Sequence, residues 1–472
     1  MRHVMQVKVL FDRNEACLYD LLAYLKEEKE GVARRELLQV LQISPQTFWK
    51  YCQQFNDYHQ GKMWEEKEKV HLHLPAHLQW QDVVASFTQD SIRMKILRLF
   101  LTHSKLSKWQ LAQKLMVSEA TVSRQLKHLN HSLQPIGIQL WNGELQGPEH
   151  WIRYFYFEFY RQTLAPKDLM SLLQAQGMYD QLYLFEGITQ RTFHPKQKME
   201  LALWLYISQW RGQANSRDFS ALKGALAPYE VSEIYRYLYQ SLLHYLTKFA
   251  TNVDQGEVGV LIAFLMARGL LSDSLNEKFL GYGGPLTEAT QWVLKGMKES
   301  LSDLNLPLQT APLAYSSHLM ARLYFFGPIF LEESPYDKKG QPPIEAKRLI
   351  AEVCQNLFHQ ELKEKQVTYY VDQLSQLWAY YRVEPIPTYR IGVCLGGPPL
   401  IRSLQMRYLS QKLRKPDQFL LEAYRENHSD DYDVLISDYY LQSVDKPVFY
   451  LKDQKIEKDL EDLKAFLKGL AE

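Results

Sequence analysis

Residues 106–130, LSKWQLAQKLMVSEATVSRQLKHLN, contain two short amphipathic segments with an interruption between them. Apolar residues recur at three- or four-residue steps, which is the spacing of one helix face, at Leu111, Leu115, Val122, Leu126 and Leu129. The interruption is Met116, Val117 and Ser118. The hydroxyl of Ser118 suits an N-cap, because it can accept a hydrogen bond from the first turn of the following helix. We therefore predict two helices joined by a tight turn.

The second of these helices has polar and basic side chains on its outer face. With Val122, Leu126 and Leu129 packed against the first helix, the residues left facing outward are Glu119, Ala120, Ser123, Arg124 and Lys127. The second helix of a helix-turn-helix enters the DNA major groove, where such side chains contact bases and phosphates. The predicted DNA-contacting residues are Ser118, Glu119, Thr121, Ser123, Arg124 and Lys127. The alternative is a helical hairpin whose charged face is only solvated.

The segment after this helix predicts a β-hairpin. Residues 138–141 and 144–146 flank Asn142 and Gly143, a dipeptide typical of two-residue hairpin turns. A hairpin directly after a recognition helix is the wing of a winged helix. Residues 91–160 also contain nine Lys and Arg against four Asp and Glu, whereas the whole chain has a net charge of +1. A local excess of positive charge is typical of phosphate binding.

A second copy of the pattern lies upstream. Eight residues define the motif: Leu111, Leu115, Val117, Ser118, Thr121, Val122, Leu126 and Leu129. The equivalent upstream positions hold Leu37, Leu41, Ile43, Ser44, Thr47, Phe48, Cys52 and Phe55. Ser44 would cap the second helix, and Pro45 would stand at its first position, where a missing N–H does no harm. The predicted DNA-contacting residues here are Gln46, Lys50 and Gln53. Residues 62–74 could supply a wing, although Glu65, Glu66 and Glu68 would repel phosphate, so a scaffold module that touches no bases is the alternative.

Length and composition limit the class of protein. A chain of 472 residues with 46% hydrophobic residues predicts several globular domains. The cysteines Cys17, Cys52, Cys354 and Cys394 are far apart and form no CxxC pair or zinc spacing, which fits a reducing cytosol. We find no N-terminal signal pattern and no apolar run long enough to span a bilayer. The expectation is a cytoplasmic protein without a metal or cofactor.

In the remainder of the chain, a helical pattern is followed by a pattern of alternating strands and helices. Residues 165–382 have helical periodicity, with glycine and proline clusters at 281–285 and 340–343. After residues 385–387, four apolar strands alternate with helices, which predicts a small parallel sheet with helices on its faces. Cys394 ends the first of these strands, where such sheets place ligands. A buried cysteine with a packing role is the alternative.

The order of these parts resembles the Mga/AtxA family of Gram-positive virulence regulators. The most specific match is VSEATVSRQLKHLN (117–130) followed by GIQLWNGELQGPEHWIR (137–153), in which Gly147, Glu149, Ile152 and Arg153 match the family's GxExxIR ending. The resemblance implies a mainly α, multidomain chain. Its parts would be an N-terminal Mga-type helix-turn-helix domain (1–75), a winged helix-turn-helix domain (76–160), two helical domains like the phosphotransferase-regulated PRD modules (161–280 and 281–388), and an α/β domain like the EIIB component of sugar phosphotransferase systems (389–472).

The same resemblance implies control sites. PRD modules are regulated by histidine phosphorylation, and APLAYSSHLMARLYFFG (311–327) resembles the histidine segment of the second module, which makes His318 the phosphoacceptor candidate. The matching stretch of the first module, LALWLYISQWR (201–211), has Tyr206 and Ile207 where a His-Ile pair is expected. VCLGGPPLIRS (393–403) resembles the EIIB loop, with Cys394 at the phosphocysteine position. Its prolines indicate a degenerate domain kept for dimerisation.

These observations predict a homodimeric DNA-binding transcription regulator, an activator and not an enzyme. The expected partners are double-stranded promoter DNA, a second copy of the chain and phosphocarrier proteins of the phosphotransferase system, with no membrane. Two other interpretations stay open. An RNA-binding antiterminator also carries paired PRD modules, but the repeated SxxT pattern argues against it. A phosphotransfer protein using His318 and Cys394 would need a chemically competent EIIB loop.

Overall fold

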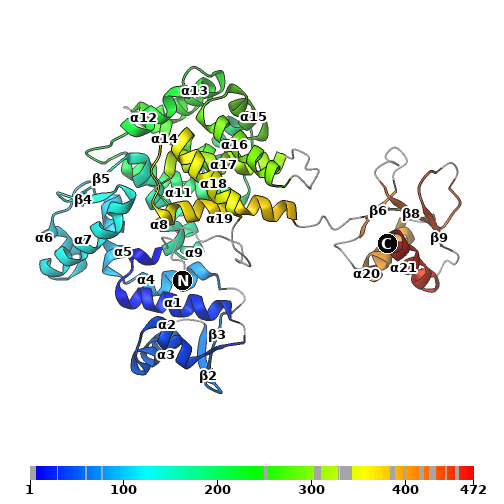
Figure 1. Cartoon of the computed structure of the whole chain (residues 1–472), viewed down its shortest axis with the longest axis horizontal. Helices are drawn as coiled ribbons and strands as arrows, with labels where there is room; N and C mark the ends of the chain where they lie inside the picture. The colour runs from blue at the N-terminus through cyan, green and yellow to red at the C-terminus, as the bar shows by residue number, and fades with distance from the viewer. Residues whose placement is uncertain are drawn as a thin grey trace. The chain divides into compact units, whose positions relative to one another are not determined.

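The computed structural model describes residues 7–28, 30–58, 61–75, 78–248, 254–301, 310–327, 329, 343–382, 389–396, 399–413, 419–424, 432–441, 444–451 and 456–471. Helices dominate these residues (Figure 1). The chain forms two compact units, Met1–Ala379 and Tyr380–Glu472, which are described separately. None of the described helices is both long enough and apolar enough to cross a lipid bilayer.

The first unit begins with a small helical module that carries a three-stranded antiparallel sheet of order β1-β3-β2. Strands β2 and β3 form a hairpin whose turn residues, Lys67 and Glu68, both have positive φ. This hairpin occupies the segment in which the sequence allowed a wing. The elements of the module are η1 (Val7–Leu10), α1 (Arg13–Glu27), β1 (Val32–Ala33), α2 (Arg34–Leu41), α3 (Pro45–Tyr58), β2 (Lys62–Glu66) and β3 (Lys69–His73).

The next segment contains the two helices and the hairpin predicted around residues 106–146. Val122 and Leu129 are fully buried and Leu126 is half-buried, so the second helix packs on the first through the predicted face. Strands β4 and β5 pair antiparallel across the Asn142 and Gly143 turn. The elements are α4 (Trp80–Thr88), α5 (Ile92–Thr102), α6 (Lys108–Leu115), α7 (Glu119–Leu133), η2 (Gln134–Ile136), β4 (Gln139–Trp141) and β5 (Glu144–Gln146).

Helix α8 (Glu149–Thr163) begins three residues after β5 and is the central helix of this unit. Its sequence, EHWIRYFYFEFYRQT, has aromatic residues on every side of the helix, and twelve of its fifteen residues are buried. A helix of this kind is stable only when it is surrounded by protein. It packs against α4, α11 (Pro195–Arg211) and α17 (Thr310–Phe326). Tyr154 stacks on Phe326 with ring centroids 4.3 Å apart. The helix therefore connects the β4–β5 hairpin directly to the helical body.

The helical body contains both segments that the sequence divided at residue 280. Helix α14 precedes that position and packs on α17, which follows it, and Ser317 donates a 3.0 Å hydrogen bond to Asn276. Residues 340–342 of the second glycine and proline cluster lie outside the described residues. The other helices are α9 (Pro166–Ala175), α10 (Leu182–Thr189), α12 (Ser220–Leu226), η3 (Ala227–Tyr229), α13 (Glu233–Thr247), α14 (Gln255–Ala267), α15 (Asp273–Tyr282), α16 (Pro285–Ser300), α18 (Ile344–Glu352), η4 (Val353–Leu357) and α19 (Glu364–Arg382).

The second unit contains the predicted parallel sheet, with strand order β7-β6-β8-β9. Its central strands are apolar on both faces, as parallel strands covered by helices are, and Ile391, Val434 and Ile436 are fully buried. Residues 385–387 and 397–398 lie outside the described residues. The elements are β6 (Tyr389–Cys394), α20 (Pro399–Lys412), β7 (Phe419–Ala423), β8 (Val434–Ser437), β9 (Val448–Tyr450) and α21 (Ile456–Ala471).

Candidate nucleic-acid interface

The turn between α6 and α7 is fixed by local hydrogen bonds. Met116 ends α6 in the left-handed conformation, with φ 53°. The Ser118 hydroxyl accepts a hydrogen bond from the Thr121 backbone N–H at 3.2 Å and lies 3.0 Å from the Thr121 hydroxyl. Ser118, one of the predicted DNA contacts, thus caps α7 while its side chain remains exposed. Thr121 is half-buried beside it.

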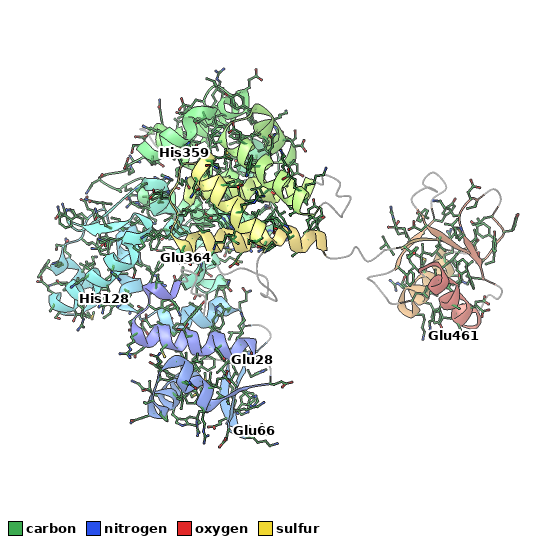
Figure 2. The ribbon with its side chains drawn as sticks, in the orientation of Figure 1. Glu28, Glu66, His128, His359, Glu364 and Glu461 are labelled. Carbon is green, nitrogen blue, oxygen red and sulfur yellow. The ribbon has the colours of Figure 1, made fainter. Side chains whose placement is uncertain are left out.

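The outer face of α7 carries cations that make no ion pair within the described part of the chain. Arg124 and Lys127 are exposed, as is Glu119, and Ser123 is half-buried. His128, labelled in Figure 2, is also exposed on this helix. Since no described carboxylate neutralises Arg124 or Lys127, both side chains are available to bind an anion.

A groove of about 930 Å³ is lined by α7, the start of α6 and the β4–β5 hairpin. Lys105, Lys108 and Lys127 line it together with Trp141, whose side chain is 60% exposed. The positively charged groups therefore surround a concave surface between the recognition helix and the wing, which suits a phosphate backbone.

The position of the wing depends on Gly143. Its carbonyl oxygen accepts a 2.9 Å hydrogen bond from the Leu106 backbone N–H, just before α6. Gly143 has φ +79°, and a Cβ at this position would lie 2.4 Å from the Leu106 carbonyl oxygen. The Asn-Gly turn thus closes the hairpin and also lets it contact the segment before α6.

The groove adds three candidate contacts that the sequence analysis did not name: Lys105, Lys108 and Trp141. One signal could have found the two lysines. Ser107 and Gln110 form a capping box at the start of α6, with Gln110 N–H donating to the Ser107 hydroxyl at 3.2 Å. This S-x-x-Q pattern marks a helix start, and it places Lys105 and Lys108 on either side of that start, next to the wing.

The structure corrects the charge argument made from the sequence. Three of the nine basic residues bind groups of the protein itself. Arg93 donates to Gln125 and to the Phe11 carbonyl, Arg98 donates to the Thr163 carbonyl, and Arg153 is fully buried. Burial lowers the pKa of Arg98. Lys95 is half-buried and pairs with Asp90 at 3.0 Å. The five exposed bases are Lys105, Lys108, Lys114, Arg124 and Lys127, of which Lys105 lies 3.7 Å from the Glu144 carboxylate. The positive surface is therefore smaller than the composition indicated, and it is concentrated around α6, α7 and the wing.

The upstream copy repeats the turn geometry. Gln42 has φ 52°, close to that of Met116, and the Thr47 backbone N–H donates to the Ser44 hydroxyl at 3.1 Å. The predicted contacts Gln46, Lys50 and Gln53 are exposed on α3. The two helix-turn-helix segments therefore share one local structure.

The electrostatic surroundings of the two copies differ. The hollow beside Lys50 and Gln53 is also lined by four carboxylates, those of Asp12, Glu15, Asp57 and Asp90. On the β2–β3 hairpin, Glu65 is paired with Arg34 at 2.9 Å, while Glu66 and Glu68 are exposed. These negative groups oppose phosphate binding, so the geometry favours α7 over α3 as the principal DNA contact.

Residues 76–160 match the model of the Mga helix-turn-helix domain. These residues form a domain of the Mga helix-turn-helix family. The matched range contains the winged helix and most of α8, and it supports the function of a DNA-binding transcription regulator. No curated protein sequence matches the chain.

The GxExxIR ending of the Mga match lies at the start of α8 and forms a buried ionic network. Arg153 Nε donates to Glu149 at 2.9 Å, and its two terminal nitrogens donate to both oxygens of Glu257 at 2.6 and 2.8 Å. Arg211 binds Glu149 at 2.7 Å, and Arg217 binds Glu257 at 2.5 Å. Burial alone would lower the pKa of Arg153, but the charges of Glu257 and Glu149 outweigh it and raise that pKa. The network links α8 to α11 and α14.

The phosphorylation candidate His318 is half-buried on α17. Its ring lies against Gly269, where a Cβ would come within 2.4 Å of it. Burial lowers the pKa of His318 to about 4, together with the nearby charge of Arg191, while Asp273 opposes the shift and Arg268 adds to it. These charged groups all come from before residue 280, so the ring lies where the two predicted PRD-like segments meet.

Cys394 is buried at the end of β6. In the loop that follows, the Gly396 backbone N–H donates to the Asp438 carboxylate at 2.8 Å. A phosphate on Cys394 would need such backbone donors, and here one of them already binds an anion. Gly397 and Pro398 of the EIIB-like loop lie outside the described residues.

Proposed function

We propose that this chain is a dimeric transcription activator that binds duplex DNA with α7 in the major groove and the β4–β5 wing along the backbone. The observation that carries the proposal is the groove between α7 and the wing, lined by Lys105, Lys108 and Lys127. A capped helix with unpaired cations on its outer face fits the helix-turn-helix docking mode. The upstream module would extend the site or support the winged helix without base contacts.

We expect Arg124→Ala and Lys127→Ala to weaken duplex binding. If each side chain neutralises one phosphate, each substitution lowers the slope of log affinity against log salt by about one unit. Duplex affinity measured across a salt titration tests this expectation. Lys278→Ala, at an exposed lysine on α15, is the control and should leave the slope unchanged. Unchanged slopes and affinities for both α7 variants would remove this helix from the interface.

Arg124 also has a sequence-specific alternative. If its guanidinium reads a guanine, Arg124→Ala should lose about 1–3 kcal/mol of discrimination at one base pair. Affinities for duplexes changed one base pair at a time distinguish this case from phosphate contact, which weakens all duplexes equally.

We infer that His318 is the site at which phosphotransferase proteins act on the PRD-like segments. A phosphoryl group adds roughly −1.5 to −2 charges, and Arg191 and Arg268 are cations whose charges act on this ring. Arg191 now donates to the carbonyls of Gly269 and Leu271, which connect α14 to α15. A new anion on His318 would compete for Arg191 and change how α14 and α17 meet.

The prediction is that His318→Asp, which adds a negative charge, and His318→Ala, which adds none, differ in dimerisation or promoter activation. Sedimentation and a promoter reporter measure the two responses, and labelled phosphate transferred from phosphocarrier proteins measures modification directly. Equal behaviour of the two variants, with no phosphate incorporated, would leave His318 a structural histidine.

We further propose that the EIIB-like unit contributes to the dimer. Helix α20 exposes three apolar side chains, Leu400, Ile401 and Leu404, with exposed fractions of 70%, 45% and 54%. A contiguous apolar helix face of this kind is typical of an interface. The same unit is an unsuitable phosphotransfer enzyme, since Asp438 occupies a backbone donor beside Cys394.

Removing residues 389–472 is expected to shift the chain from dimer towards monomer in sedimentation experiments. Leu404→Glu in the full chain should act in the same direction, because it places a charge within the apolar face of α20. An intact dimer in both variants would move the interface to the helical body.

A further inference from the structure

A cavity of about 820 Å³ lies in the helical body, between the α9–α10 connection, the end of α11, α13 and the first turn of α14. This volume is within the range of small-molecule binding pockets. Its wall combines apolar side chains with four glutamine amides, three hydroxyl groups and three charged groups. The residues are Gln176, Gln181, Gln209 and Gln213, then Tyr183, Ser208 and Tyr245, then Asp180, Arg217 and Glu257.

The polar groups of the wall are mostly neutral. Tyr245 donates a 2.5 Å hydrogen bond to the carbonyl oxygen of the Gln181 side chain, which leaves that amide's nitrogen to donate elsewhere. The side chains of Gln176, Gln209 and Gln213 make no hydrogen bond within the described residues, and each amide can both donate and accept. Such a wall matches hydroxyl groups, which also donate and accept.

The charged residues of the wall argue against an ionic ligand. Its guanidinium, that of Arg217, already binds Glu257 at 2.5 Å. An anion would meet the carboxylates of Asp180 and Glu257, whereas a cation would find only Asp180, which is solvent-exposed. The rings of Tyr183 and Tyr245 offer aromatic surface for the apolar face of a ligand.

We propose that this cavity binds a neutral polyhydroxylated molecule of the size of a mono- or disaccharide. The glutamine amides hold its hydroxyls, and the tyrosine rings pack against its carbon–hydrogen face.

The cavity shares Glu257 with the ionic network of α8. Glu257 binds Arg217 on the cavity side and Arg153 on the α8 side, and α8 follows the wing strand β5. A ligand hydroxyl that donates a hydrogen bond to Glu257 competes with Arg153 for the same carboxylate and weakens the pairing of Glu257 with Arg153. In this way the ligand changes how α8 holds the wing, a consequence that rests on the proposed DNA-binding function.

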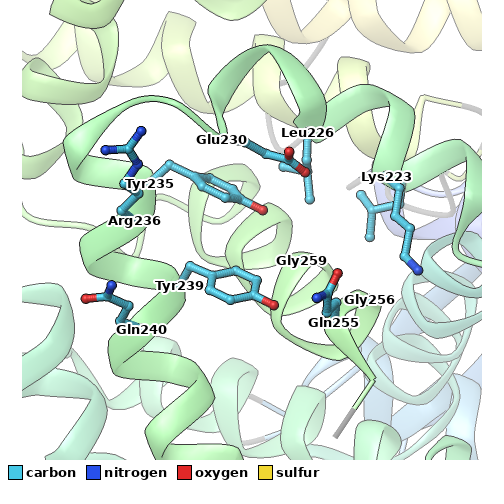
Figure 3. Close-up of a pocket in the computed structure, with 11 residues that line it drawn as sticks. Lys223, Leu226, Glu230, Tyr235, Arg236, Tyr239, Gln240, Gln255, Gly256 and Gly259 are labelled. Carbon is cyan, nitrogen blue, oxygen red and sulfur yellow. The ribbon is translucent and has the colours of Figure 1, made fainter.

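A second cavity of about 330 Å³ provides a matched control. It borders another face of α14 through Gln255, Gly256 and Gly259, and the hydroxyls of Tyr235 and Tyr239 point into it from α13 (Figure 3). Its wall contains Lys223, Glu230 and Arg236 and lacks the cluster of glutamines that lines the larger cavity.

The test is calorimetric titration of the full chain with glucose, galactose, mannose and sucrose, and with glucose 6-phosphate as the charged counterpart. At least one neutral sugar is expected to bind saturably, and the double variant Gln209→Ala/Gln213→Ala should lose at least tenfold in affinity. Both glutamines are exposed, so the double variant should still fold, which its circular dichroism spectrum checks. Gln240→Ala, in the smaller cavity, should bind as the unchanged chain does.

Three results would overturn the proposal: no saturable binding of any neutral sugar, binding of glucose 6-phosphate alone, or equal affinity in the double variant. The link to DNA is measured separately, as duplex affinity with and without saturating sugar, and a ratio of one removes it. A chain that binds sugar and no duplex would refute the proposed function and leave the cavity assignment standing.

Discussion

Replacing Arg153 with alanine should destabilise the chain by about 3–5 kcal/mol, the usual result of removing one partner from a buried ion pair. Arg153 is fully buried and makes three hydrogen bonds to Glu149 and Glu257. Without it, the carboxylates of Glu149 and Glu257 are each left with one ion-pair partner in the described part of the chain, Arg211 and Arg217 respectively. The large cost reflects the two carboxylates left behind, because Glu149 is fully buried and the Glu257 side chain is only 13% exposed.

Denaturant unfolding of the full chain and of Arg153→Ala measures this difference. Arg153→Lys is the matched control, because it keeps a positive charge but cannot bind both oxygens of Glu257 with a planar fork. The lysine variant should fall between the other two. Equal stability of Arg153→Ala and the unchanged chain would mean that the network is not buried in solution.

The helix-turn-helix could be predicted from the sequence because its determinants are local. Ser118 caps a helix that begins at the next residue, by accepting a hydrogen bond from a backbone N–H three residues on, and Val122 and Leu129 follow the helical period. The wing likewise depends on the adjacent residues Asn142 and Gly143. A window of a few residues holds all of this information.

The ionic network could not be predicted in the same way. Glu257 is 104 residues from Arg153 in the chain, and nothing near either residue indicates the pairing. For the same reason the sequence analysis included Arg93, Arg98 and Arg153 in the phosphate-binding charge. In the structure, all three side chains bind other groups of the protein or are buried. A charge count does not distinguish an arginine at the surface from one that binds a distant carboxylate.

The glycine and proline cluster at 281–285 illustrates a related limit. It does end α15 and begin α16, as turn residues predict. It does not separate two bodies in space, because α14 and α17 pack together across it. Breaks along the chain are local, whereas the extent of a packed core depends on contacts between distant helices.

His150 should make the protein sensitive to acid. It lies in the first turn of α8, is only 4% exposed, and its Nδ1 is buried with no hydrogen-bond partner among the residues that the structure describes. Burial lowers the pKa of His150 to about 3, against the opposing charge of Asp218. The folded chain therefore keeps this ring neutral at pH values at which an unfolded chain would protonate it.

The sign of the effect follows from proton linkage. Between pH 6.5, the ordinary pKa of histidine, and about 3, the unfolded state binds one more proton at this residue. Stability is fully present above pH 6.5 and falls as the pH drops, by about 1.4 kcal/mol per unit and at most roughly 5 kcal/mol in total. His318, whose pKa is lowered to about 4, adds a smaller contribution of the same sign.

His150→Phe removes the titrating group and keeps a ring of similar size beside Phe326, whose centroid is 6.2 Å away. The loss of unfolding free energy between pH 7 and pH 4 should be smaller in this variant by about 3 kcal/mol. Denaturant unfolding at a series of pH values measures it. Between pH 7 and 8 the unfolding free energies of the two proteins should change with pH in the same way. His150 is neutral there in both the folded and the unfolded chain, so any change in packing only adds a constant difference. Identical acid slopes would show that His150 is protonated in the folded chain and that the start of α8 is open to water.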